Sequence, residues 1–211
     1  MTRPSRNIDR LLIDTARELL PHMGCRGFSI RQLTERAGVN LGMFHYHFKT
    51  RDNFLSIVLQ GVYEEMFSRL SFQAHAERAP VENLRAAANV LGRFLRDNRL
   101  LFRRLLPDAM AGDTVAQDFL RRNFPRHLGV MTGLIGDAQR AGELRRLPLF
   151  QAMAFLAGAV GMPIMMATAM LEGRFAPSIV DNLEQDVLSD TAIGQRVDMA
   201  LAGLRPSSRQ A

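Results

Sequence analysis

Cysteine, tryptophan and lysine are almost missing from this 211-residue chain. Cys25 is the only cysteine, and tryptophan does not occur. One cysteine excludes an internal disulfide, which is compatible with a reducing compartment and a cytoplasmic protein. The first residues contain no long apolar stretch, so we expect no secretory signal. Redox sensing by Cys25 stays open, although a lone cysteine in a turn is more commonly a small packing residue.

Lysine is as scarce as cysteine, because Lys49 is the only one and arginine supplies the remaining positive charge. The formal net charge is +6. Residues 1–54 carry nine Lys/Arg and five Asp/Glu, a net +4, whereas the other 157 residues carry 18 and 16, a net +2. The positive charge is therefore concentrated in the first quarter of the chain, where it is compatible with a polyanionic partner.

Strict apolar–polar alternation and hairpin signals such as Asn-Gly are missing too. Apolar residues recur at helical spacing instead, which predicts an all-α protein. Gly24 is expected to end the first helix. Ser29, with Gln32 three residues later, has the pattern of a capping box that begins the next one. The last helix is expected over residues 179–203.

Residues 29–48 have the pattern of two short helices joined by a tight turn that contains Gly38. Asn40 is expected to cap the second of these helices. At about 100° per residue, Phe44 and Phe48 share its inner face, whereas the polar aromatic side chains point outward. This pattern is typical of a helix-turn-helix, whose second helix enters the major groove of DNA.

The residues that we expect to contact DNA are polar, aromatic or basic and lie around the second helix. Met43, Tyr46 and Asn40 are expected near the bases, because methionine and polar side chains can contact base edges. Hydroxyl, imidazole and cationic groups donate to phosphate oxygens, and a helix N-terminus also favours an anion. Arginines before the first helix could form an arm for the minor groove. The full set is Arg3, Arg6, Ser29, Arg31, Asn40, Leu41, Gly42, Met43, His45, Tyr46, His47, Lys49 and Arg51.

The segments "IDTARELL" and "FSIRQLTERAGVNLGMFHYHFKTRDNFL" resemble the DNA-binding region of TetR/AcrR-type transcriptional regulators over residues 8–58. The segment "GLIGDAQRAGELR" is similar to the end of a long helix in that family. Two departures stand out, since His45 replaces the usual tyrosine and Arg51 stands where lysine is common. His45 adds a pH-sensitive charge at a position that usually contacts the DNA backbone.

The resemblance implies a helix-turn-helix domain over residues 1–52, a helical effector-binding and dimerisation domain over 53–205, and a disordered tail over 206–211. It implies a homodimer that binds a near-palindromic double-stranded DNA operator, and more often a repressor than an activator. It also implies a small effector that releases the DNA. A DNA-binding dimer without any effector is the alternative that the sequence leaves open.

Methionine and phenylalanine crowd the C-terminal part of the chain, where few polar residues interrupt them. An ordinary helical core explains most such residues. Methionine also repacks around varied apolar shapes, so an adaptable pocket for a lipophilic effector is the sharper hypothesis. The residues expected to line it are Phe94, Phe102, Met110, Phe124, His127, Met131, Phe155, Met162 and Met166.

Three other classes of function find less support. Two histidines spaced i, i+2 on a helix point about 200° apart, so we expect no metal at His45 and His47, and we expect no cofactor. The sequence contains no Gly-rich phosphate loop and no nucleophile elbow, so we do not expect an enzyme. Residues 147–171 contain no charge and are long enough to span a membrane. Their many small residues also suit a helix–helix interface in a dimer, and we expect no membrane partner.

Overall fold

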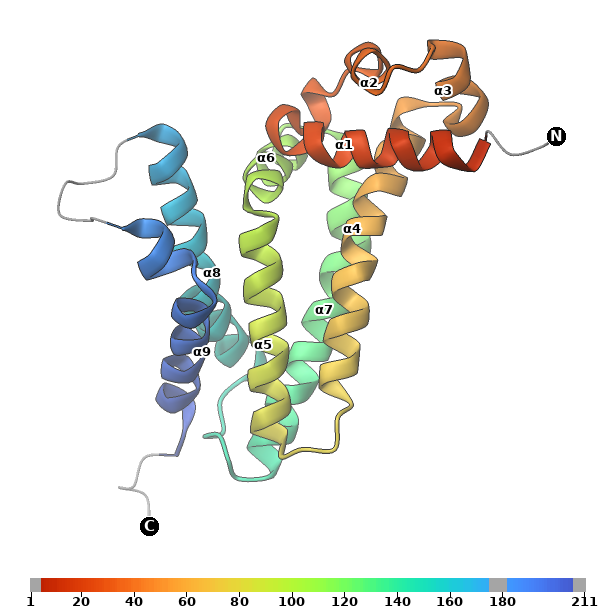
Figure 1. Ribbon diagram of the computed structural model, residues 1–211. Coiled ribbons are helices and arrows are strands. Elements are labelled where there is room, and N and C mark those ends of the chain that lie inside the picture. Colours follow the sequence, from red (N-terminus) through yellow and green to blue (C-terminus); the bar gives the residue numbers. More distant parts are fainter. Residues whose placement is uncertain (1–4, 175–181, 207–211) are drawn as a thin grey trace. The chain divides into compact units, whose positions relative to one another are not determined.

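The computed structural model describes residues 5–174 and 182–206, and for residues 5–7 only the helical backbone. All the regular elements of these residues are helical, which confirms the all-α class (Figure 1). The helices are α1 (Ser5–Gly27), α2 (Ile30–Ala37), α3 (Leu41–Phe48), α4 (Arg51–Ala74), α5 (Pro80–Asp97), α6 (Arg99–Met110), α7 (Thr114–Arg140), α8 (Leu149–Gly173), the π-helical turn η1 (Glu184–Leu188) and α9 (Asp190–Leu204).

The chain divides into two compact units. The first contains residues 1–64 and 100–123, and the second contains residues 65–99 and 124–211. Helices α4 and α7 therefore contribute residues to both units. The boundary between residues 52 and 53 that the resemblance implies stays a prediction, and the tail expected over 206–211 lies, beyond Pro206, outside the described residues.

The ends of α2 and α3 form as their sequences predict. The Oγ atom of Ser29 accepts from the amide of Gln32 at 3.4 Å, which is one of the two bonds of the expected capping box. Gly38 ends α2 with a φ of 66°, a left-handed conformation that glycine adopts at little cost. The side chain of Asn40 then begins α3 by accepting from the amide of Met43 at 2.9 Å.

Four phenylalanines fix α3 against its neighbours in the first unit. Phe44 and Phe54 are completely buried, and Phe28 and Phe48 nearly so. The ring centroids lie 4.7 Å apart for Phe48 and Phe54, and 5.2 Å apart for Phe44 and Phe54, both with edge-to-face geometry. Such pairs stabilise beyond the area that they bury, so the inner face of α3 is rigidly held.

In the second unit, α5, α8 and α9 pack against one another. Gly92 of α5 permits this approach, because an added Cβ would lie 2.8 Å from Ile193 and 2.9 Å from Val160. The last helix is shorter than the 179–203 expected from the sequence. Ser189 has an extended backbone and caps α9 by accepting from the amide of Ala192, so the chain breaks after η1. Residues 179–181 lie outside the described part.

Helix α8 is the one described helix that is long and apolar enough to cross a membrane by length and composition. Only 28% of its most apolar window is buried within the chain. Phe155, Met162 and Met166 are half-exposed on this helix, and Met199 is exposed on α9. An exposed apolar surface of this kind is typical of a site that contacts another protein, a membrane or a ligand.

Candidate nucleic-acid interface

The outer face of α3 presents an aromatic ring, an aliphatic side chain and exposed polar groups. The Tyr46 residue is 76% exposed and Leu41 is 50% exposed, whereas the phenylalanines of the opposite face are buried. Gly42 and His45 are exposed as well, and Met43 is partly exposed. A single exposed aromatic ring is common on protein surfaces, so this face of α3 is distinguished by the ring together with the exposed polar groups beside it.

His45 is held by the end of its own helix. Its Nδ1 atom lies 3.1 Å from the carbonyl oxygen of Lys49. A carbonyl oxygen only accepts, so Nδ1 carries the proton and Nε2 is left for other partners. Lys49 itself has a φ of 63°, which ends α3 and turns the chain toward α4. With the described residues, Lys49 makes no ion pair, so its ammonium group is available to an outside anion.

The outward orientation expected for His47 is wrong. The His47 side chain is only 7% exposed, and its Nδ1 atom lies 2.5 Å from Oδ1 of Asp9 in α1. Helical periodicity treats His47 as an outer residue of α3, but α1 passes alongside and covers it. The Nε2 atom is buried as well, so a phosphate contact by His47 would require the side chain to move.

Arg51 is also engaged inside the protein. Its Nε atom donates to the carbonyl oxygen of Phe28 at 3.1 Å, one terminal nitrogen donates to that of Cys25, and the other pairs with Asp52 at 2.7 Å. Because its guanidinium donates to two carbonyl groups at and just beyond the end of α1, Arg51 stabilises the connection from α1 to α2. The phosphate contact expected for Arg51 stays a prediction that competes with these bonds.

Arg31 projects from the first turn of α2 beside Ser29, the residue that caps this helix. It forms an exposed pair with Glu35, with 2.8 Å between Nε and Oε1. Exposed pairs of this kind contribute little to stability, so the guanidinium can exchange Glu35 for a phosphate at small cost.

The arginines proposed as a minor-groove arm are placed differently. Arg6 lies inside the first turn of α1, which begins at Ser5, and so it doesn't precede the helix as the sequence suggested. Arg3 lies outside the described residues.

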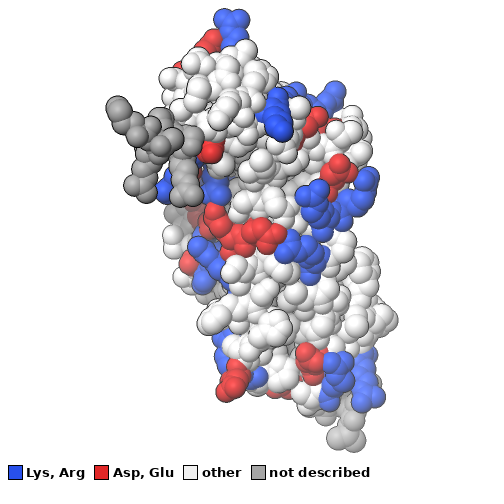
Figure 2. All heavy atoms as spheres, turned by 90° about the vertical axis from the view of Figure 1, so that its right-hand side faces the viewer, with Lys and Arg blue, Asp and Glu red and all other residues white. Residues whose placement is uncertain are grey.

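Basic side chains do not form a continuous surface on the face that Figure 2 shows. Figure 2 shows Lys and Arg side chains in separate groups with Asp and Glu between them. Arg10 pairs with Asp14, and Arg36 pairs with Glu18. Binding to a polyanion therefore depends on where individual groups lie on α2 and α3, more than on net charge.

A contact from α6 to the end of α1 was not predicted. The Asp108 carboxylate accepts from the amide of Cys25 at 2.6 Å and from that of Arg26 at 3.3 Å. Gly24, with φ 70° and ψ 177°, kinks α1 and exposes these amides. Burial, assisted by the nearby carboxylates of Asp113 and Asp108, raises the pKa of the Cys25 thiol to about 12. Cys25 is therefore a packed structural residue at neutral pH.

The residues expected to line an effector pocket differ in burial. Met131 is buried, and Phe94, Phe102 and His127 are partly buried. The other five are exposed by half or more: Met110, Phe124, Phe155, Met162 and Met166. The ring of His127 contacts that of Phe124 edge-to-face, with 5.3 Å between centroids.

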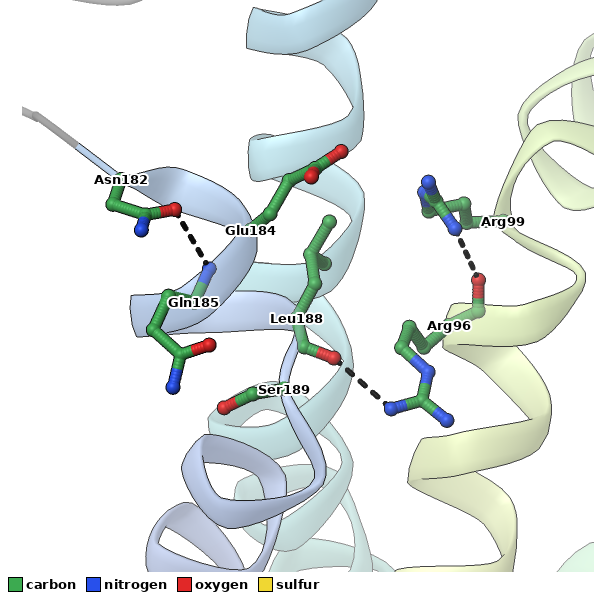
Figure 3. Close-up of a pocket in the computed structure, with 7 residues that line it drawn as sticks. All are labelled: Arg96, Arg99, Asn182, Glu184, Gln185, Leu188 and Ser189. Atoms are coloured by element: carbon green, nitrogen blue, oxygen red, sulfur yellow. Dashed lines mark hydrogen bonds between the residues drawn. The ribbon is translucent and has the colours of Figure 1, made fainter.

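A polar pocket in the second unit is lined by residues other than these nine. Figure 3 shows it between the end of α5 and the segment around η1, with lining residues Arg96, Arg99, Asn182, Glu184, Gln185, Leu188 and Ser189. Arg96 donates to the carbonyl oxygen of Leu188 at 3.1 Å and pairs with Asp190 at 2.5 Å. These bonds join α5 to the start of α9. Within the described residues, no group of three His, Cys, Asp or Glu side chains could hold a metal ion.

Comparisons with known proteins point to one family. Residues 12–56, which include α2 and α3, match the family model described as "Bacterial regulatory proteins, tetR family". No curated protein shows detectable sequence similarity to the chain.

Several solved structures share the fold over nearly the whole chain. A ketosteroid transcriptional regulator of Mycobacterium tuberculosis has 14% identity and a TM-score of 0.69, with 98% of each chain covered. A bacterial regulatory protein in the tetR family from Rhodococcus has 13% identity and a TM-score of 0.68, with 99% of this chain and 100% of that chain covered. The transcriptional regulator FadR from Bacillus subtilis, in complex with stearoyl-CoA, has 13% identity and a TM-score of 0.66, with 93% and 99% covered.

Proposed function

Because this chain is a DNA-binding transcriptional regulator of the tetR family, and not an enzyme, we propose that α3 is its recognition helix. The observation that carries the proposal is the exposed Tyr46 ring on a helix whose opposite face is fixed by buried phenylalanines. Tyr46 and Met43 face the bases in this proposal, together with the free amide nitrogen of Asn40. Ser29, Arg31, His45 and Lys49 contact phosphates and set the register of the helix on the duplex.

The second part of the proposal is a homodimer that binds a near-palindromic operator. The half-exposed apolar residues of α8 and the exposed Met199 of α9 support it, because a surface this apolar is usually covered. A second copy of the same surface would cover it through two-fold symmetry. Phe155, Met162 and Met166 then serve the dimer contact in place of an effector pocket.

The third part is repression that a lipophilic effector relieves in the cytoplasm. Two structural neighbours support an apolar ligand, since one is a ketosteroid transcriptional regulator and the other was solved in complex with stearoyl-CoA. Such a ligand acts only through different affinities for the DNA-bound and free conformations. The alternative, a DNA-binding dimer without an effector, predicts that no steroid or fatty acyl compound raises the thermal midpoint of the protein.

A selection from random double-stranded DNA, at one stated salt concentration, tests the DNA-binding proposal. We expect an enriched near-palindrome, which then serves as the probe for variants. Tyr46→Ala and Lys49→Ala should each weaken binding to this probe by about tenfold, as loss of a base or phosphate contact does. Lys49→Ala should also reduce the dependence of affinity on salt.

Matched controls separate these contacts from general effects. Phe72→Ala removes an aromatic ring of similar exposure from the end of α4, and Arg140→Ala removes an exposed cation from α7. Both should bind the probe as the wild type does. If Tyr46→Ala and Lys49→Ala also bind normally while folded, α3 is not the recognition helix.

A further inference from the structure

Asp9 is an acidic residue on α1 in the first unit, and it is not among the residues proposed to contact DNA. Its Oδ1 atom is buried and lies 2.5 Å from Nδ1 of His47, although the Asp9 side chain as a whole is 41% exposed. A buried carboxylate oxygen is costly unless a positive or donating group compensates it. The imidazole of His47 is in position to compensate this oxygen, and the His47 side chain is only 7% exposed.

The His47 ring also contacts the ring of Tyr46. Their ring centroids lie 5.1 Å apart with an angle of 88° between planes, an edge-to-face contact. Tyr46 is otherwise largely in water. An exposed tyrosine on a helix normally samples several rotamers, so this contact restricts where its hydroxyl points. Asp9, His47 and Tyr46 thus form a chain of contacts from α1 to the outer face of α3.

We propose that Asp9 is a positioning residue for DNA binding, which acts through His47 to hold the Tyr46 ring in its binding orientation. The proposal rests on the role of α3 given above. It assigns His47 to the support of the interface and not to the interface itself. Orientation before binding raises affinity, because the ordering of the side chain is no longer lost on association.

The sign of the effect distinguishes this role from a simple surface charge. An acid near DNA repels the phosphates, so its removal should tighten binding if charge alone matters. If Asp9 positions Tyr46, its removal should weaken binding despite the more favourable charge. The two explanations therefore predict opposite changes for the same substitution.

The experiment measures affinity for the selected DNA with Asp9→Ala, His47→Ala and the double variant. We expect Asp9→Ala to weaken binding by about tenfold in the wild-type background, a typical coupling for residues in contact. In the His47→Ala background, the same substitution should cause no further loss. Asp14→Ala is the matched control, since Asp14 is also an α1 acid but forms an exposed pair with Arg10. It should not weaken binding.

A second measurement reads the position of Tyr46 without DNA. The chain has two tyrosines, so protein labelled with 3-fluorotyrosine gives two fluorine signals, from Tyr46 and Tyr63. Tyr63 is buried, and its hydroxyl donates to the carbonyl oxygen of Asn123. Asp9→Ala should shift the Tyr46 signal and leave the Tyr63 signal in place, which also shows that the fold persists. If Asp9→Ala unfolds, Asp9→Asn is used in its place, because asparagine has nearly the same shape as aspartate.

The outcomes are separable. Unchanged or tighter binding of Asp9→Ala, or an equal loss with and without His47, would overturn the positioning role. So would an unmoved Tyr46 signal. Normal binding by Tyr46→Ala would instead refute the proposed recognition helix, whatever Asp9 does.

Discussion

Gly24→Ala should be among the most destabilising single-methyl substitutions in the first unit. Gly24 has φ 70° and ψ 177°, a backbone conformation that is essentially restricted to glycine. A Cβ added there would lie 2.5 Å from Oδ2 of Asp108 and 3.3 Å from Cβ of Arg104. The methyl group therefore meets both backbone strain and the carboxylate that caps the amides of Cys25 and Arg26.

The magnitude has two parts. Alanine in this backbone region costs about 2 kcal/mol. Displacement of the Asp108 carboxylate weakens the cap on two amides, which costs about 1–2 kcal/mol. The sum of about 3 kcal/mol corresponds to a fall in thermal midpoint of ~10 °C for a chain of this size. Urea unfolding followed by circular dichroism measures the change in free energy, provided that the slope stays unchanged.

A double-mutant cycle with Asp108→Ala separates the two parts. Asp108→Ala alone should cost about 1–2 kcal/mol through loss of the cap. In that background Gly24→Ala should cost only the backbone strain, so the two changes together should cost about 1–2 kcal/mol less than their sum. Gly129→Ala is the control, because an added Cβ there meets no atom within 4 Å. A change below about 0.5 kcal/mol for Gly24→Ala, the usual size of a neutral surface substitution, would refute the reasoning.

Two further predictions concern Cys25 and the dimer. With the pKa of Cys25 raised from 9.0 to about 12, the thiolate fraction at pH 7–8 falls about 1,000-fold, so native protein should react with Ellman's reagent about 1,000 times more slowly than unfolded protein. Rapid labelling of the folded protein near neutral pH would contradict this prediction. The raised pKa also means that the contribution of the Cys25 thiol to the free energy of unfolding is complete below pH 9 and is lost as pH rises toward 12. Met162→Glu should convert a dimer to monomers, because a charge replaces an apolar contact. Met110→Glu places the same charge at an exposed position of α6, outside α8 and α9, and should leave the dimer intact. Sedimentation analysis measures both, and a Met162→Glu dimer of normal stability would exclude this face.

Local sequence signals predicted the helix-turn-helix well. Ser29 and Asn40 cap their helices through contacts three residues away, and Gly38 supplies a left-handed backbone position. Phe44 and Phe48 are buried as their spacing predicts. These features depend on neighbours within one or two helical turns, which is the range over which a sequence pattern carries direct physical information.

The contacts of His47 and Arg51 could not be predicted in the same way. Periodicity assigns a residue to a face of its own helix, but it does not say which other helix passes over that face. His47 meets Asp9, 38 positions earlier, and Arg51 meets the carbonyl groups of Cys25 and Phe28. Both contacts bring the N-terminal helix back onto α3 and α4. The acidic residue and the carbonyl groups carry no sequence signal that marks them as partners.

The apolar C-terminal helix shows a different kind of ambiguity. Uncharged residues over 147–171 fit a membrane span, a pocket wall or a dimer surface equally well by composition. Burial divides them: Ile164 and Ala167 pack inside the second unit, whereas Met162 and Met166 remain half-exposed or more. The observed division, with one side packed and the other exposed, is compatible with the proposed dimer, in which a second copy of the chain would cover the exposed side.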